Sequence, residues 1–434
     1  MSTIVAIATG PAAGGIGIIR FSGASALTAA RVLAPSLPGR PTPRHAYFTR
    51  LVAEDGAVLD EGLALFFAGP KSFTGEDVVE LHAHGAPRLL SLLLERALKV
   101  EGVRLATPGE FTRRALLNGR LDLARAEAVA DLISAESEAQ VRAAAAQLSG
   151  ELSARLSRIQ EPLIALQADV EGSLDFPEEA EGADVDVVPR LDAALREVRA
   201  LLGDAKRGSL IRRGARVVLY GPVNAGKSTL FNALVGSSRA LVDAEPGTTR
   251  DTLEARVELS GLAVTLVDTA GLREGAGRIE ALGIERTREA LKGADVAVLV
   301  LPPDGSANDR SLWRSEVDQP LEVEGKADLP GAREGALRVS GLTGAGVDQL
   351  RALLAARLGA GAAGATLSTS ERHVHVLTEL EAALSNARAA VDVATLEIVA
   401  GELNLAVHAL AELTGEDAST QLLDAIFQRF CIGK

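Results

Sequence analysis

At 434 residues the chain is long enough for about three domains of ordinary size, and its 47% of apolar residues can supply a core for each. Its net charge of −13 argues against a surface that binds nucleic acid everywhere, so an RNA partner would need a local basic patch. The single cysteine, Cys431, excludes an internal disulfide, and no apolar run is long enough to span a membrane. We therefore expect a cytoplasmic protein without a membrane segment.

The first part of the chain, residues 1–118, alternates short apolar runs with Gly and Pro turns. Residues 16–21, 63–67 and 78–81 have the composition of strands, and residues 87–100 have helical periodicity. This mixture predicts a compact α+β domain at the N-terminus.

The next part changes to long, Ala-, Leu-, Arg- and Glu-rich sequence with helical periodicity, which runs from residue 121 to about residue 204. Only an acidic stretch at residues 175–184, which contains Pro177, interrupts this pattern. Helical periodicity returns after a Gly- and Ala-rich connecting segment at residues 359–366. We predict a discontinuous all-α domain formed by residues 119–212 and 359–434.

Between these helical stretches, residues 213–358 alternate apolar strand-like runs with helical patterns. This alternation predicts a mostly parallel sheet with crossover helices. An α/β domain inserted into a helical domain is tolerated when its two ends lie close together. The predicted strands are residues 217–220, 253–259, 264–267, 296–301 and 337–339.

The strongest motif is GPVNAGKS at residues 221–228, between the first of these strands and a helical pattern at residues 229–234. In that context a glycine-rich loop directs backbone N–H groups at phosphate oxygens, and the helix N-terminus adds favourable charge. Lys227 would reach the outer phosphates, and the Ser228 hydroxyl would bind Mg²⁺. The sequence therefore predicts a nucleoside triphosphate site at Asn224, Ala225, Gly226, Lys227, Ser228 and Thr229.

Four further segments follow in order: GTTRD from Gly247, DTAG from Asp268, GKAD from Gly325 and SGLTGAG from Ser340. With the phosphate loop they resemble the translation-factor-related GTPases, an α/β fold. The resemblance implies that Thr249 binds Mg²⁺ and that Asp328 accepts hydrogen bonds from guanine N1 and N2. It also implies GTP contacts from Asp268, Thr269, Ala270, Gly271, Lys326 and Ser340.

Two positions depart from the family pattern. Gly325 stands where asparagine is usual, which removes a side-chain tether between this loop and the phosphate loop. We expect Asp328 to keep guanine selectivity and the affinity to fall. Gly341 replaces the usual alanine, a milder change.

The hydrolytic groups also differ from those of many regulatory GTPases, because Leu272 stands where a glutamine often orients the attacking water. Glu280 resembles the glutamate that does so in one GTPase family; the alternative is a solvated helix residue. A resemblance to potassium-activated GTPases implies a K⁺ ion held by Asn224, Asp243, Glu245 and Thr248.

The segments outside the α/β region are more specific. SFTGEDVVELHAHG at residues 72–85, PGEFTRRALLNGRLDLARAEAVADLISA at residues 108–135 and FCIGK at residues 430–434 resemble the MnmE (TrmE) family of tRNA-modification GTPases. The resemblance covers essentially the whole chain.

In that family the N-terminal domain binds a tetrahydrofolate one-carbon donor, in the 5-formyl or 5,10-methylene form, and forms a constitutive homodimer. The matching folate-contact positions are Arg20, Glu80, Arg120 and Lys434. A carboxylate can accept hydrogen bonds from a pterin ring, and cations suit its glutamate tail. Cys431 is a candidate nucleophile or a merely packed cysteine.

The resemblance implies that the chain works with the flavoprotein MnmG (GidA) in a heterotetramer. Together they would add an aminomethyl or carboxymethylaminomethyl group to C5 of the wobble uridine of certain tRNAs. Dimerisation of the two GTPase domains would drive potassium-activated GTP hydrolysis, and hydrolysis would drive the opening and closing of these domains across the dimer. Arg113 and Arg114 are candidates for tRNA phosphate contacts. The alternatives are a ribosome-assembly GTPase and a GTP-timed, RNA-associated scaffold.

Overall fold

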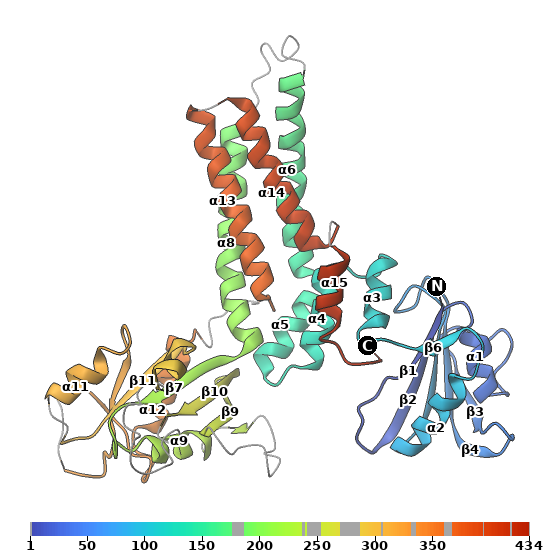
Figure 1. The fold of residues 1–434 in the computed structure, drawn as a ribbon, viewed down its shortest axis with the longest axis horizontal. Helices are drawn as coiled ribbons and strands as arrows, with labels where there is room; N and C mark the ends of the chain where they lie inside the picture. The colour runs from blue at the N-terminus through green and yellow to red at the C-terminus, as the bar shows by residue number, and fades with distance from the viewer. Residues whose placement is uncertain are drawn as a thin grey trace. The chain divides into compact units, whose positions relative to one another are not determined.

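A computed structural model describes residues 2–175, 186–236, 239–240, 253–269, 287–304, 307–330, 336–359, 367–393, 395–416 and 419–433 (Figure 1). The chain divides into two compact units. The first unit combines Met1–Ala130, Gln147–Arg196 and Glu379–Lys434, and the second combines Asp131–Ala146 with Glu197–Thr378. The three predicted domains divide the chain more finely, and their boundaries stay a prediction.

The first unit begins with a sheet that has six strands within residues 2–175, in the order β3-β4-β5-β2-β1-β6. Neighbouring strands are antiparallel except β1 and β6, which are parallel. The three predicted strands lie within β2, β4 and β5. The strands are β1 (Thr3–Ile7), β2 (Gly14–Ser22), β3 (Ala46–Val52), β4 (Val58–Phe67), β5 (Val78–Gly85) and β6 (Val103–Leu105).

Helices cover both faces of this sheet, as the alternation of side chains along β1 requires. Val5 packs in the core that the sheet forms with α1 (Ala26–Leu33) and α2 (Pro87–Ala97). Ile4 and Ala6 point the other way and pack on Phe111 of α3 (Glu110–Leu117). The predicted helix 87–100 is therefore confirmed as α2, which ends at Ala97.

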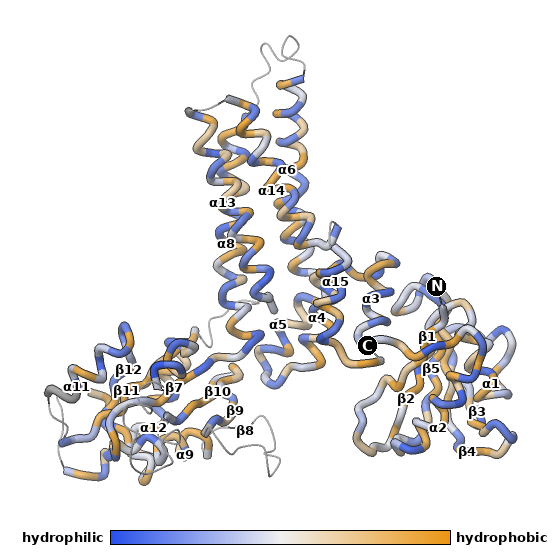
Figure 2. The backbone as a smooth tube through the Cα atoms, in the orientation of Figure 1, coloured by the Kyte–Doolittle hydropathy of each residue, from blue (hydrophilic) through white to orange (hydrophobic). Residues whose placement is uncertain are grey.

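The helical part of the first unit contains α4 (Leu123–Ile133), the long α6 (Glu151–Asp175), α14 (Leu396–Thr414) and α15 (Thr420–Phe427). In Figure 2 the long helices alternate between hydrophobic and hydrophilic residues, the pattern of helices that pack along one face. A small hydrophobic core packs the start of the first helical stretch, in α4, against α15 and the residues that follow it, near the C-terminus. Its buried members are Leu123, Ala126, Leu423, Phe427 and Phe430.

The predicted helical run 121–204 is broken at more places than the acidic stretch. Helix α5 (Glu138–Leu148) is separated from α4 by a turn in which Gln140 Oε1 accepts hydrogen bonds from the backbone N–H groups of Glu136 and Ser137. Gly150, with φ of +95°, separates α5 from α6. These breaks correct the prediction, because local turn hydrogen bonds outweighed helical composition.

The second unit is built on a sheet with seven strands in its described part, in the order β13-β12-β11-β7-β10-β9-β8. The run from β13 to β10 is parallel and β9 is antiparallel, which confirms a mostly parallel sheet. The strands are β7 (Ala215–Tyr220), β8 (Arg239–Ala240), β9 (Leu253–Leu259), β10 (Leu262–Asp268), β11 (Val296–Leu301), β12 (Leu321–Glu324) and β13 (Leu337–Arg338).

The helices beside this sheet include α9 (Lys227–Gly236), α11 (Ala307–Arg314) and α12 (Val347–Arg357). One face of the sheet packs against α9 and α12 through Leu230, Leu234 and Leu350. The other face holds Tyr220 and Trp313, whose ring centroids lie 6.3 Å apart. The strands predicted from residues 253–259 and 296–301 are confirmed with the same bounds.

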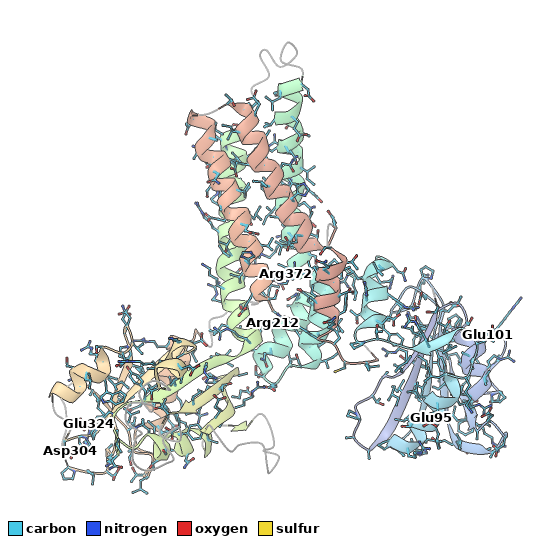
Figure 3. The ribbon with its side chains drawn as sticks, in the orientation of Figure 1. Glu95, Glu101, Arg212, Asp304, Glu324 and Arg372 are labelled. Atoms are coloured by element: carbon cyan, nitrogen blue, oxygen red, sulfur yellow. The ribbon has the colours of Figure 1, made fainter. Side chains whose placement is uncertain are left out.

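The α/β region is anchored where the chain enters and leaves it. Arg212, labelled in Figure 3, lies near the end of α8 (Val187–Arg213). It donates from Nε to both carboxylate oxygens of Asp131, at 2.7 and 2.8 Å. Ser368, after the α/β region and before α13 (Glu371–Val393), donates to Oδ2 of Asp131 at 2.7 Å. The carboxylate of Asp131 therefore accepts hydrogen bonds from both segments that connect the α/β region to the rest of the chain.

These elements confirm the predicted multidomain fold class: an α+β N-terminal part, helices formed by two separated stretches of sequence, and an α/β region between them. Among the described helices, none combines the length and the hydropathy that a membrane span requires.

Candidate functional site

The GPVNAGKS segment forms the loop between β7 and α9. Gly221 has φ of +136°, and a Cβ there would lie 2.3 Å from the carbonyl oxygen of Val300, so the first loop position has room only for glycine. Asn224 and Gly226 also have positive φ, +58° and +95°. This succession of turns places the loop's backbone in front of the N-terminus of α9, the arrangement that binds phosphate oxygens.

Lys227 lies inside this loop and is 4% exposed. Its ammonium donates hydrogen bonds to the carbonyl oxygens of Gly221 at 3.0 Å and Pro222 at 2.7 Å. These neutral acceptors hold the charge at the phosphate side of the loop, where an anionic ligand would form stronger, charge-assisted bonds.

Two residues of the DTAG segment reach the same place because β10 runs parallel to β7. Asp268 ends β10 opposite Leu219 and is fully buried. Thr269 donates to the carbonyl oxygen of Leu219 from its backbone N–H at 3.3 Å and from its hydroxyl at 2.9 Å. The structure therefore brings Asp268 and Thr269 beside the start of the phosphate loop.

The GKAD and SGLTGAG segments form a pocket of about 310 Å³ next to the phosphate loop. Ser340 Oγ donates to Oδ1 of Asp328 at 2.5 Å, and this hydrogen bond lowers the pKa of Asp328. The stem of Lys326 lies over Gly226, with its Cγ 3.6 Å from where a Cβ of that glycine would be. The pocket is lined by Gly226, Thr229, Leu230, Gly325, Lys326, Asp328, Leu329, Val339, Ser340, Gly341 and Leu342.

Several predicted site residues lie outside the described residues. They are Asp243, Glu245, Thr248, Thr249, Ala270, Gly271, Leu272, Glu280 and Lys434. Of the predicted K⁺ ligands only Asn224 is described, and of the two predicted Mg²⁺ ligands only Ser228. The roles given to these residues stay predictions.

A second pocket, of about 230 Å³, lies in the N-terminal domain. Arg20 on β2 faces Glu80 on β5 across the sheet, and its Nε donates to Glu80 Oε1 at 2.8 Å. The other carboxylate oxygen of Glu80 lies 3.2 Å from Nε2 of His82. The pocket is lined by Arg20, Arg44, Phe67, Ser72, Phe73, Thr74, Val78 and Glu80.

The C-terminal tail approaches this pocket. Nη1 of Arg20 lies 3.5 Å from the carbonyl oxygen of Gly433, and a Cβ on Gly433 would lie 2.3 Å from the carbonyl oxygen of Ile7. The Cys431 carbonyl accepts a hydrogen bond from Gly109 N–H at 3.3 Å, and the cysteine is exposed. Arg120 is exposed, and its stem lies beside Gly75 in the loop that lines the pocket.

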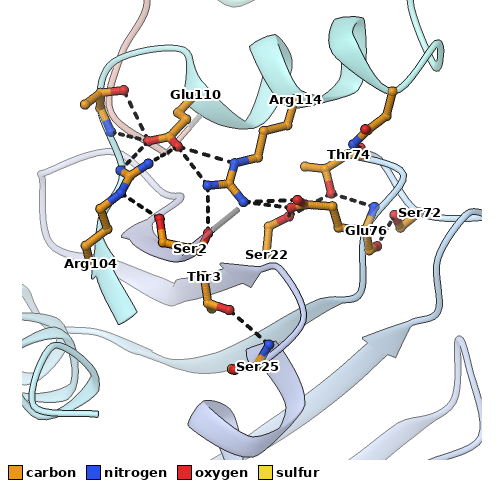
Figure 4. A network of polar contacts seen from close by, with 12 residues as sticks. Ser2, Thr3, Ser22, Ser25, Ser72, Thr74, Glu76, Arg104, Glu110 and Arg114 are labelled. Atoms are coloured by element: carbon orange, nitrogen blue, oxygen red, sulfur yellow. Dashed lines mark hydrogen bonds and ion pairs between the residues drawn. The ribbon is translucent and has the colours of Figure 1, made fainter. Parts of the chain in front are cut away.

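Arg114 belongs to a buried network of polar contacts (Figure 4). It is 3% exposed and donates to Glu76 Oε2 at 2.9 Å and to Glu110 Oε1 at 2.9 Å. Its predicted contact with tRNA phosphates is therefore wrong, since both anionic partners are internal carboxylates. Arg113, the neighbouring residue, keeps a side chain that is 33% exposed and pairs with Asp424 at 2.9 Å.

The network continues to the wall of the second pocket. Ser22 Oγ donates to Glu76 Oε2 at 2.7 Å and lies 2.7 Å from the hydroxyl of Thr74, which lines the pocket. Ser72, also in the lining, donates to the Glu76 carbonyl at 2.5 Å. Arg114 thus holds the pocket loop through Glu76.

Comparison with known proteins gives two family matches that follow one another along the chain. Residues 3–120 match the N-terminal domain described as "GTP-binding protein TrmE N-terminus", and residues 123–431 match the "MnmE helical domain". A "tRNA modification GTPase MnmE" from Myxococcus xanthus is 60% identical over 436 residues, covering 100% of this chain and 99% of the relative. This chain belongs to the MnmE family.

Other MnmE proteins match over the same extent. The protein from Laribacter hongkongensis is 44% identical, covering 100% of this chain and 99% of the relative. The protein from Azoarcus sp. is 45% identical over 99% of this chain and 98% of the relative. The resemblance inferred from the sequence motifs is therefore confirmed over the full chain.

Sequence reasoning missed several residues of the second pocket in this MnmE-family chain. Ser72, Phe73 and Thr74 line it, and Glu76 fixes its loop, yet only Glu80 was singled out from that segment. The signal was present, because all of them lie in the SFTGED stretch that supported the family resemblance. Among the described residues, no group of three or more His, Cys, Asp or Glu side chains is placed to hold a metal ion.

Proposed function

We propose that this MnmE-family chain hydrolyses GTP and takes part in tRNA modification. The observation that carries the proposal is the pocket in which a fixed carboxylate, Asp328, lies beside a phosphate loop that contains the buried Lys227. A guanine base offers N1–H and N2–H donors to one carboxylate, and the phosphates of the same nucleotide would reach the loop. The names of the relatives support the link to tRNA.

The phosphate end of the site would work by charge and geometry. Backbone N–H groups of residues 224–229 and the N-terminus of α9 would hold the phosphates, and Lys227 would exchange its two carbonyl partners for phosphate oxygens. Ser228 and Thr249 would bind Mg²⁺, with the buried Asp268 carboxylate nearby, and hard oxygen donors of this kind fit that ion. Bound Mg²⁺ neutralises charge on the outer phosphates.

For hydrolysis we propose that Glu280 orients the attacking water, since Leu272 cannot form a hydrogen bond. Asn224, Asp243, Glu245 and Thr248 would hold a K⁺ ion whose charge stabilises the phosphates, when two GTPase domains of a homodimer meet. The support is the resemblance to potassium-activated GTPases and the exposed position of Asn224 in the loop.

The second pocket would bind a tetrahydrofolate derivative in the 5-formyl or 5,10-methylene form. Its lining suits a flat heterocycle, because Glu80 is an acceptor for ring N–H donors and Phe67 and Phe73 offer apolar faces. Oε1 of Glu80 is contacted by both Nε and Nη2 of Arg20 at 2.8 Å, whereas Oε2 has the His82 ring as its neighbour at 3.2 Å and keeps a second lone pair for a ligand. Arg120 and Lys434 would pair with the glutamate tail, and Cys431 would lie near the one-carbon unit.

The finer reaction is proposed from the family resemblance. With the flavoprotein MnmG in a cytoplasmic heterotetramer, the chain would add an aminomethyl or carboxymethylaminomethyl group to C5 of the wobble uridine of certain tRNAs. Family membership favours this over a ribosome-assembly GTPase. A GTP-timed scaffold remains the alternative if the second pocket binds no folate.

The test of the folate site is equilibrium dialysis of the full chain with 5-formyltetrahydrofolate. Glu80→Gln should weaken binding about tenfold or more, since a charged acceptor is lost. Glu61→Gln is the matched control, because Glu61 on β4 also pairs with an arginine, Arg50 on β3, at 3.0 Å, but both of these side chains are exposed. Equal binding by wild type and Glu80→Gln would refute the assignment.

The tRNA function is tested by nucleoside analysis of tRNA from cells that lack this gene. Loss of the modified wobble uridine, restored by the wild-type gene, is expected. Unchanged nucleosides together with folate binding would leave a folate-binding GTPase that acts elsewhere.

A further inference from the structure

The pocket around Asp328, formed by the GKAD and SGLTGAG segments, is called the base pocket below. It contacts the phosphate loop and the start of α9 through two glycines that have no room for a side chain. A Cβ on Gly325 would lie 2.2 Å from the carbonyl oxygen of Ala225 in the phosphate loop. A Cβ on Gly341 would lie 2.4 Å from the carbonyl carbon and oxygen of Thr229, at the start of α9. In both cases the obstructing atoms are backbone atoms, which cannot turn aside as a flexible side chain can.

The requirement for glycine at these positions is one of space. Neither Gly325 nor Gly341 has a φ in the left-handed region, so a left-handed backbone conformation is not the reason for glycine at these positions. Gly226 in the phosphate loop is the opposite case, with φ of +95° and only the stem of Lys326 nearby. The two glycines of the base pocket therefore mark close backbone approach.

The GKAD and SGLTGAG loops are also fixed by backbone hydrogen bonds within the α/β region, so they cannot move freely away from the phosphate loop. Gly325 N–H donates to the carbonyl oxygen of Leu301 at 2.8 Å, and Ala327 N–H donates to that of Val339 at 3.1 Å. Ser340 N–H donates to the carbonyl oxygen of Ala345 at 2.8 Å. A side chain added at either glycine would have to break such bonds or push the phosphate loop.

We propose that Gly325 and Gly341 set the distance between the base-recognition loops and the phosphate loop, so that direct backbone packing replaces the side-chain tether expected at position 325. This inference rests on the proposed binding of GTP. The sequence led us to expect that glycine at position 325 lowers guanine nucleotide affinity, and the structure implies the opposite. Restoring asparagine there weakens guanine nucleotide binding, because the added side chain separates Asp328 from the loop that holds the phosphates.

The experiment compares the full-length wild type with Gly325→Asn, Gly325→Ala and Gly341→Ala, by titration with GDP and with GTP in the presence of Mg²⁺. We expect each variant to bind about tenfold or more weakly, the size of effect that overpacking a close contact produces. Gly236→Ala is the matched control, since this glycine ends α9 with no atom within 4 Å of an added Cβ and should leave affinity unchanged.

Thermal unfolding without nucleotide separates a shifted pocket from an unfolded one. Weaker binding with an unchanged melting temperature supports the proposal, and Gly325→Ala provides the smaller change if the asparagine variant does not fold. Tighter binding by Gly325→Asn overturns it, because the asparagine would then act as the missing tether. Failure of the wild type to bind either nucleotide would instead contradict the proposed function itself.

Discussion

The hydroxyl of Ser340 donates a 2.5 Å hydrogen bond to Oδ1 of Asp328, and this bond joins the two loops of the base pocket. It holds the carboxylate in one orientation and keeps it ionised by lowering its pKa. A base that offers two N–H donors side by side therefore meets a carboxylate whose position is already fixed. Less free energy of binding is then lost in ordering the Asp328 side chain.

Asp328→Asn should exchange guanine for xanthine selectivity. An amide presents a donor where the carboxylate accepts, and xanthine carries an oxygen where guanine carries its N2 amino group. We expect GDP affinity to fall about a hundredfold and XDP affinity to rise, because two hydrogen bonds to a charged group are involved. Competition binding with GDP and XDP measures both changes. Asp318→Asn, at an exposed position, is the control.

Asn224→Gly should remove stimulation by K⁺ while leaving nucleotide binding intact. The residue has φ of +58°, which glycine adopts without strain, so this variant deletes the side-chain oxygen and preserves the loop. GTP turnover by the wild type is expected to be faster in K⁺ than in Na⁺ at equal ionic strength. Equal wild-type rates in the two salts would refute the proposed K⁺ site, whatever the variant does.

Arg114→Met and Arg113→Met should differ strongly although the residues are adjacent. Removing the buried Arg114 takes the shared cation away from Glu76 and Glu110. Only Glu110 keeps a cationic partner, Arg104, so we expect a loss at the lower end of the about 3–5 kcal/mol typical of a broken buried pair. Arg113 forms a partly exposed pair worth about 0–1 kcal/mol. Thermal unfolding measures both variants, and equal melting temperatures would contradict the buried network.

The lowered pKa of Glu110 leads us to expect that the folded state around α3 loses stability in acid. Burial alone would raise the pKa of Glu110, but hydrogen bonds from Arg104, the Thr107 backbone and Arg114 outweigh it and lower the pKa to about 2. A lowered pKa stabilises the folded state above the ordinary value of 4.5, and that contribution of roughly 3 kcal/mol is lost as pH falls toward 2.

The measurement is hydrogen exchange of peptides that cover α3, corrected for the intrinsic effect of pH, because a chain with several domains need not unfold in one step. Wild-type protection should fall between pH 5 and pH 3 more steeply than that of Glu110→Gln, about two pH units being enough to see the difference. Parallel curves for the two proteins would show that Glu110 does not carry the acid dependence.

Much of this protein follows from the sequence alone. The phosphate loop, the strands of the α/β region and the family were predictable because each depends on residues close together in the chain: glycines at fixed spacing, apolar runs of strand length and uninterrupted motifs. Asp328 and Lys227 belong to the same class, since their neighbours in sequence define their roles.

Only the tertiary structure decided the contacts between distant segments. Arg114 was a candidate for tRNA phosphate contacts from its sequence and is buried, because the fold brings it to Glu76 on another loop. Gly325 looked like a lost tether and proves to be a point of close backbone approach to Ala225. Local patterns specify what a residue can do, but burial and separation depend on which segments the fold brings together.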